Sequence, residues 1–245
     1  MSLAPSARDG SDGDADLAER LADEIQSRVV SGEIAVGSWL RQGRLAEQFA
    51  ISRTPIREAL QTLRARGVIE LIPNRGARVR LPTLREIRES YSLRARLEGF
   101  AAELAADLIS HVQLGRLRTA ERLFEEAVGE FASQRTSDPS DSGGQRSWLA
   151  ANDLFHEVLQ EASCNRLLQE TIASLHRSFP RNLTWGVLGD IRLLEENVAQ
   201  HRLIREAVER RDGAAARQLM IAHIERSGEL IASRAPMGRV DGFAR

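Results

Sequence analysis

The strand signals of this 245-residue chain end at Pro82, and that limit divides the sequence into two kinds of segment. After it, Thr83 and Glu86 form a capping box that opens a helical pattern reaching about residue 109. Helical periodicity then continues to Ser233 without alternating apolar residues. We therefore expect an all-α helical bundle over residues 83–235. Its further helices are expected over residues 112–131, 147–162, 165–178, 190–211 and 214–233.

Before Pro82 the patterns are mixed. Apolar residues recur every four positions from Leu17 to Val29, which predicts a first helix. Three helices followed by a β-hairpin predict a winged helix-turn-helix over residues 17–82, so the fold as a whole is mainly α. The two other helices are expected over residues 45–50 and 52–66, and the two strands over 68–72 and 77–81.

Polar segments surround these two domains. Residues 1–16 are rich in Ser, Asp and Gly and are expected to form a disordered tail. Residues 236–245 are expected to form a second, flexible tail. The stretch 133–146 has almost no apolar residues, so it is expected to form a loop inside the helical half.

The composition indicates in which cellular compartment the protein is found. No stretch reaches the roughly 18 uninterrupted apolar residues of a membrane span, and the N-terminus has no apolar signal-peptide core. The single cysteine, Cys164, excludes an intramolecular disulfide and a cysteine-cluster zinc site. We therefore expect a cytoplasmic protein with no membrane partner.

A basic segment is concealed by the formal net charge of −1. Residues 36–82 carry nine arginines against three glutamates, a local charge of about +6. On the predicted third helix, Arg53 and Arg57 lie away from the apolar stripe, and arginine can bond guanine edges in the major groove. Ser52 and Thr54 at the start of this helix can bond phosphates, and Arg75 at the hairpin tip can reach a neighbouring groove or the DNA backbone. A solvated polar face is the alternative, but the basic wing beside it favours binding to double-stranded DNA.

The segment LAEQFAISRTPIREAL, residues 45–60, closely resembles the helix-turn-helix signature of GntR-type regulators. The resemblance extends over residues 17–79 and includes the glycine-containing wing. It departs from the family at residues 39–42, where a proline commonly follows the leucine. It implies that Arg53, Thr54 and Arg57 contact operator DNA and that Gly76 lets the backbone approach it. With Ser52, Arg75 and a further arginine of the basic segment, Arg44, the predicted DNA-contacting residues are Arg44, Ser52, Arg53, Thr54, Arg57, Arg75 and Gly76.

Three histidines, His156, His201 and His223, lie where the core of the helical half would be expected to use leucine. His201 and His223 are each 11 residues from Asp212, so two helices that turn there bring both imidazoles to one level. Asn152 precedes His156 by one helical turn. The four side chains could offer three nitrogens and one oxygen to a divalent metal such as Zn²⁺ or Ni²⁺. The alternative for each histidine is a hydrogen-bonded core residue.

Residues 91–98, 152–156, 200–204 and 220–223 resemble the FCD effector domain of the FadR-type subfamily. The resemblance covers about residues 83–233. Metal-binding members of this subfamily use one Asp or Asn and three His, which implies Asn152, His156, His201 and His223 as ligands. Asn152 stands where Asp is commoner, and the missing negative charge should weaken cation affinity.

Arg94 lies between apolar residues on the first helix of the helical half. In the family the matching arginine often faces the effector cavity, and small carboxylates are the usual effectors. The resemblance therefore implies a small organic acid held by the metal and by Arg94. The alternative is an internal salt bridge between Arg94 and Glu98.

The sequence thus predicts a transcriptional regulator, acting as a repressor and not as an enzyme, that binds a palindromic operator as a homodimer. A small carboxylate metabolite would control it, through a metal ion. One alternative is a metal-dependent enzyme in which the histidines hold a metal with an open position for water. The other is a DNA-binding protein with an inert dimerisation domain.

Overall fold

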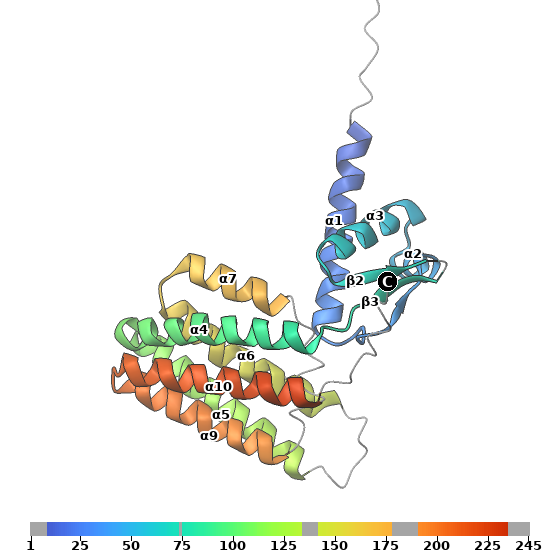
Figure 1. Ribbon diagram of the computed structural model, residues 1–245. Coiled ribbons are helices and arrows are strands. Elements are labelled where there is room, and N and C mark those ends of the chain that lie inside the picture. Colours follow the sequence, from blue (N-terminus) through green and yellow to red (C-terminus); the bar gives the residue numbers. More distant parts are fainter. Residues whose placement is uncertain (1–8, 74, 134–141, 178–190, 235–245) are drawn as a thin grey trace, which may run out of the picture. The chain divides into compact units, whose positions relative to one another are not determined.

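The computed structural model describes residues 9–73, 75–133, 142–177 and 191–234 (Figure 1). It separates into two compact units, with a division after Pro82. The N-terminal unit contains three helices and a small sheet, in agreement with the predicted winged helix-turn-helix. Its elements are α1 (Asp9–Val30), β1 (Trp39–Leu40), α2 (Gln42–Phe49), α3 (Arg53–Ala65), β2 (Ile69–Ile72) and β3 (Gly76–Val79).

The sheet of this unit has one strand more than the sequence predicted. The two-residue strand β1 pairs with β3, so the antiparallel order is β1-β3-β2. In the hairpin, Ile69 lies opposite Val79, and both side chains are buried against the helices. A strand of two residues is too short to show the alternation by which strands are recognised.

Helix α1 starts earlier than the sequence predicted. Residues 9–16 are helical, so the expectation of a disordered tail was wrong for them, whereas residues 1–8 lie outside the described residues. The second half of α1 buries Ile25 and Val29 against α3. Ile56 and Leu63 of α3 are fully buried in the same core, which leaves the other face of α3 to solvent.

The second unit is built from helices, as predicted. Thr83 and Glu86 form the expected capping box at the start of α4. The polar stretch 133–146 was expected to be a loop, but α6 already begins at Ser142; residues 134–141 and the predicted tail at 236–245 lie outside the described part. The described helices are α4 (Leu84–Leu108), α5 (His111–Ser133), α6 (Ser142–Ala162), α7 (Arg166–Arg177), α9 (Ile191–Glu209) and α10 (Gly213–Arg234).

Helices α4 and α10 run side by side in close contact (Figure 1). Two glycines allow this approach. A Cβ atom at Gly228 would lie 2.5 Å from Cβ of Tyr91, and one at Gly99 would lie 2.7 Å from Cγ1 of Ile221. Since Cβ of Tyr91 is fixed to its backbone, the two helices can lie this close only with glycine at position 228.

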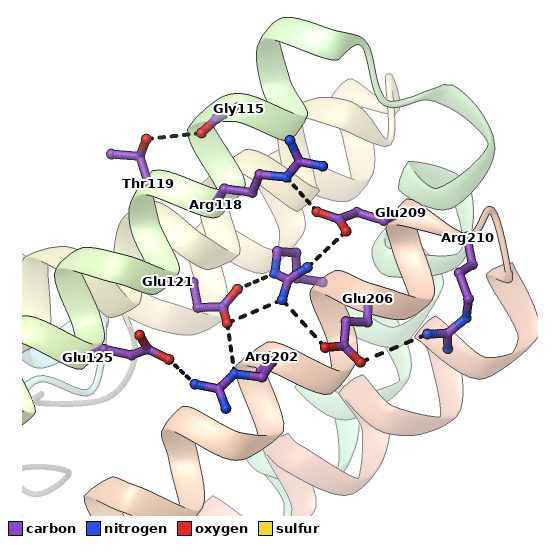
Figure 2. Close-up of polar contacts among 10 residues, drawn as sticks. Gly115, Arg118, Thr119, Glu121, Glu125, Arg202, Glu206, Glu209 and Arg210 are labelled. Carbon is purple, nitrogen blue, oxygen red and sulfur yellow. Dashed lines mark hydrogen bonds and ion pairs between the residues drawn. The ribbon is translucent and has the colours of Figure 1, made fainter.

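Helices α5 and α9 are joined at the surface by an ion-pair network, shown in Figure 2. At its centre the nearly buried carboxylate of Glu121 accepts hydrogen bonds from Arg202 and Arg205. Glu209 continues the network, with 2.7 Å to Nε of Arg118 and 2.9 Å to Nη1 of Arg205. The pairs of Glu121 with Arg202 and Arg205 and the pair of Arg118 with Glu209 cross between the two helices, so the network fixes their axial register.

In the described part of the chain, no helix has the length and the apolar character that crossing a membrane requires.

We expect Gly228→Ala to lower the free energy of unfolding by about 1–3 kcal/mol, because the added methyl group overpacks the contact with Tyr91. Urea denaturation measures this. The control is Gly129→Ala on α5, where a Cβ atom meets nothing within 4 Å. That change should add about 0.5–1 kcal/mol because alanine favours the helix. Equal effects of the two substitutions would contradict the close packing of α4 on α10.

Candidate functional site

Helix α3 presents a polar, basic face opposite its buried stripe. The side chains of Arg53, Thr54 and Arg57 are all exposed, and neither arginine forms an ion pair with a described residue. Ser52 occupies the N-cap position with an extended backbone, but its hydroxyl makes no capping hydrogen bond. The N-terminus of α3 therefore offers backbone N–H groups, a hydroxyl and two guanidinium groups on one exposed surface, which suits phosphates and base edges.

The wing carries a second set of basic groups. The guanidinium of Arg75 lies 5.9 Å from the ring centroid of Trp39 on the neighbouring strand. Gly76 has a φ of +108°, a conformation that side chains other than glycine rarely adopt. Arg44 on α2 is exposed as well. All seven residues predicted to contact DNA thus lie on the surface of the N-terminal unit.

Two other arginines of the basic segment serve the fold. Arg66 bonds Asp23 of α1 at 2.7 Å and also contacts Glu19. Arg78 lies 3.2 Å from Glu70, its partner across the hairpin. The structure therefore separates arginines that hold the domain together from those that are available to a ligand, a distinction that charge counting does not provide.

In the helical unit, His156, His201 and His223 come together from α6, α9 and α10. One nitrogen from each lies within 4.8 Å of the others, and all three side chains are buried. The ring centroids of His201 and His223 are 4.8 Å apart, as expected from their equal distances to the turn at Asp212. Three imidazole nitrogens at this spacing match the ligand set of a Zn²⁺ or Ni²⁺ site.

His201 is fully buried in an aromatic environment. Its ring stacks on Phe155 with a centroid distance of 4.1 Å, and Phe124 lies 4.6 Å away. Among the described residues neither ring nitrogen of His201 has a hydrogen-bond partner. A buried polar atom without a hydrogen bond costs about 1–3 kcal/mol of stability. A ligand that binds the nitrogens of His201 would remove this cost.

His223 is held by a polar chain that fixes its tautomer. Nδ1 lies 2.7 Å from Oε1 of Gln200, whose amide nitrogen donates to Glu196 at 3.2 Å. The bond to Glu196 turns the amide oxygen of Gln200 toward the ring, and an oxygen can only accept. The proton of His223 therefore lies on Nδ1, and Nε2 keeps its lone pair.

Two of these histidines, His201 and His223, are neutral at physiological pH. Burial, with neighbouring His156, lowers the pKa of His223 to about 3. Burial also lowers the pKa of His201 well below its usual value, and the two neighbouring imidazoles add to the effect. Metal ions bind neutral imidazole, so the fold holds these two side chains in the form that binds.

A buried carboxylate, Glu98, lies directly beside this cluster. Oε1 accepts from Nη2 of Arg94 at 2.9 Å and lies 3.0 Å from Nε2 of His176. Oε2 lies 2.9 Å from Nδ1 of His156. Burial alone would raise the pKa of Glu98, but Arg94 and the two histidines lower it well below its usual value. Glu98 is therefore ionised.

The sequence predicted only part of this arrangement. The Arg94–Glu98 pair follows from a spacing of four on one helix, and it was the alternative to an effector-binding role for Arg94. The contact of His176 with Glu98 was not predicted, because the two residues are 78 positions apart in the sequence and no local spacing relates them. Asn152 lies one turn before His156 on α6 and is partly buried. The roles of Asn152 as a ligand and of Arg94 as an effector contact stay predictions.

Two family profiles match the chain and cover the two units. The profile of bacterial regulatory proteins of the gntR family matches residues 17–79, and the FCD domain matches residues 89–226. The first match contains α3 and the wing, and the second contains Glu98 and the three histidines.

Curated relatives match along most of the chain. An uncharacterised HTH-type transcriptional regulator of Bacillus subtilis, YdhC, is 28% identical over 84% of this chain and 87% of its own length. A probable D-xylose utilization operon transcriptional repressor of Paenarthrobacter nicotinovorans is 28% identical and covers 85% of each chain. The galactonate operon transcriptional repressor of Escherichia coli is 27% identical over 85% of this chain and 94% of its own.

Solved structures show the same fold. McbR/YncC of E. coli superimposes with a TM-score of 0.70 at 20% identity, over 90% of this chain and 99% of that one. A GntR regulator from Rhodococcus gives a TM-score of 0.67 at 21% identity, over 89% and 99%. The profiles, the relatives and the fold agree, and the chain belongs to the GntR family of bacterial transcriptional regulators, with an FCD domain as its C-terminal half.

Proposed function

We propose that the chain is a homodimeric, cytoplasmic repressor whose FCD domain holds a divalent metal ion and responds to a small carboxylate. The observation that carries this proposal is the buried cluster of three histidines, in which His201 has two ring nitrogens without a described partner. A core histidine kept for stability would have a hydrogen bond.

The residues fit a metal ion. His156, His201 and His223 would hold it, with the side-chain oxygen of Asn152 as the fourth ligand, and the ion would supply a positive charge to a carboxylate. Arg94 would then hold the second part of the acid. Its guanidinium is 13% exposed and packs on the ring of Tyr91 at 4.7 Å while it pairs with Glu98.

The names of the relatives support repression and an acidic metabolite. Relatives with matches along most of the chain are named as repressors of the D-xylose and galactonate operons. Galactonate is a sugar acid and carries a carboxylate. The competing view, a metal-dependent enzyme, needs a general base beside the metal, and Glu98, which contacts the cluster, pairs with Arg94 and His176 through one oxygen and faces His156 with the other.

The homodimer is supported by the solvent face of α4. Leu93, Phe100 and Leu108 recur at spacings of seven and eight on the exposed side of the helix, whereas Leu97 and Leu104 are partly buried against the cluster of Ala101, Leu168 and Ile172. Leu93, Phe100 and Leu108 are 49%, 39% and 52% exposed. Around a two-fold axis near residue 100, antiparallel α4 helices would place Leu93 of one copy opposite Leu108 of the other, with the two Phe100 side chains close to the axis. We therefore assign a second copy of the chain to this surface.

For DNA, we expect Arg53→Ala and Arg57→Ala each to weaken operator binding by about 1–3 kcal/mol, because each removes a contact to a base edge. Fluorescence anisotropy with a fragment selected by the wild-type protein from random-sequence DNA measures this. Arg85→Ala is the control: it removes the same charge from an exposed residue of α4. Wild-type affinity in both α3 variants would remove this helix from DNA reading.

For the metal, we expect one Zn²⁺ or Ni²⁺ per chain and a rise in melting temperature when a small carboxylate is added to the loaded protein. His201→Leu should abolish metal uptake. The same change should stabilise the chelator-treated protein by about 1–3 kcal/mol, because two buried nitrogens without partners are removed. His111→Leu, at an exposed histidine, is the control and should change stability by less than about 0.5 kcal/mol.

Asn152→Asp should tighten metal binding, since it restores the negative charge at the fourth ligand. Inductively coupled plasma mass spectrometry of protein prepared without a His-tag counts the metal. A wild-type chain that takes up no metal at micromolar concentrations would contradict the metal site. The histidines would then be direct ligands of the effector.

For the dimer, we expect Phe100→Glu to produce monomers at micromolar concentration, because a charge would be buried in the apolar seam of α4. Sedimentation velocity gives the mass in solution. Val112→Glu introduces the same charge at an apolar residue that is 76% exposed on α5, and it should leave the dimer intact. A dimeric Phe100→Glu protein would place the interface on another surface.

A further inference from the structure

Glu98 is one of the most deeply buried charged groups in the described part of the helical unit, with 2% of its side chain exposed. Its two oxygens have different surroundings. Oε1 is bonded by Arg94 and by His176, from α4 and α7. Oε2 has no hydrogen-bond partner among the described residues, and its nearest polar contact is Nδ1 of His156 at 2.9 Å.

Nδ1 of His156 likewise has no hydrogen bond. The atom is buried, and Glu98 is the described residue that lies within reach of it, at 2.9 Å. The present angle is poor for a hydrogen bond, so a small rotation of the ring is needed to align the pair. Because an ionised carboxylate can only accept, it favours a proton on Nδ1. The lone pair of His156 then lies on Nε2, on the opposite side of the ring.

The geometry points to Glu98 as the positioning residue of the histidine site: it holds the proton of His156 on Nδ1 and so directs the Nε2 lone pair toward His201 and His223. This inference rests on the proposed metal site. Gln200 does the same for His223, as its hydrogen bonds show. A carboxylate behind a histidine ligand fixes the ring and makes the imidazole a stronger donor.

The position of Glu98 also compensates for Asn152. The four proposed ligands carry no negative charge, and the carboxylate behind His156 is the nearest described anion. Arg94 and His176 do not merely neutralise it. They occupy Oε1 and thereby leave Oε2 to His156, so α4, α6 and α7 meet at one carboxylate.

Glu98→Gln tests the inference because the amide has only one oxygen. Arg94 can only donate, so it should hold the amide oxygen at the Oε1 position and turn the NH₂ group toward His156. An amide N–H facing Nδ1 moves the proton of His156 to Nε2, the atom needed for the metal. We expect Zn²⁺ affinity, measured at pH 7.5 by competition with a chromophoric chelator, to fall by about 10–100-fold or more.

The matched control is Glu121→Gln. Glu121 is also a nearly buried carboxylate paired with arginine in the same domain, but it lies in the α5–α9 network. This variant should lose stability and keep wild-type metal affinity. Glu98→Asp keeps two acceptor oxygens and should retain more affinity than Glu98→Gln.

A second measurement needs no variant. In metal-free wild-type protein labelled with ¹⁵N-histidine, long-range ¹H–¹⁵N spectra should show His156 as the Nδ1–H tautomer. The visible spectrum of the Co²⁺-loaded protein should also change in Glu98→Gln, which a loss of stability alone would not produce.

The outcomes are distinct. Weakened metal binding in Glu98→Gln but not in Glu121→Gln, with the Nδ1–H tautomer in the wild type, supports the inference. Equal affinity in wild type and Glu98→Gln, or an Nε2–H tautomer of His156 in the wild type, overturns it and leaves the metal site standing. A wild-type protein that binds no metal overturns the proposed metal site itself.

Discussion

The burial of His201 is the constraint on which the helical domain depends. A polar ring is enclosed by Phe155 and Phe124 in the place of an apolar side chain, and its nitrogens receive no hydrogen bond from the described residues. Two more imidazoles from α6 and α10 face it. Such a core is less favourable than one of leucines until something binds the nitrogens, so binding and stability are coupled at this point.

The helices around the cluster differ in how they are held. Helices α4 and α10 are locked by glycine contacts at which no other side chain fits, whereas α7 contacts α4 through a few apolar residues, Leu168 and Ile172 among them, and through His176. Helix α7 is therefore tied to the buried Glu98 carboxylate mainly by the contact of His176 near its C-terminal end.

Much of the fold and part of the site followed from the sequence, for identifiable physical reasons. Helical periodicity and the capping box at Thr83 are local, and the meeting of His201 with His223 needs only a helix pitch and one turn. The Glu98–His176 contact, by contrast, depends on how α7 packs on α4, which no local pattern encodes. Strand β1 was missed because pairing with β3, rather than its own two residues, makes it a strand.

The network between α5 and α9 has a further consequence for the conditions under which the domain keeps its shape. All of its cations are arginines, whose charge persists at any pH a cell meets, and its anions are glutamates (Figure 2). Burial would raise the pKa of Glu209, but Arg118 and Arg205 hold it below its usual value. The contribution of Glu209 to the stability of the fold is therefore fully present above the pKa that this group has in the unfolded chain. It is lost as the pH falls through the lower pKa of the folded protein. The ion pairs of Glu209 therefore persist at high pH and break at low pH, and they hold α9, the helix that carries His201.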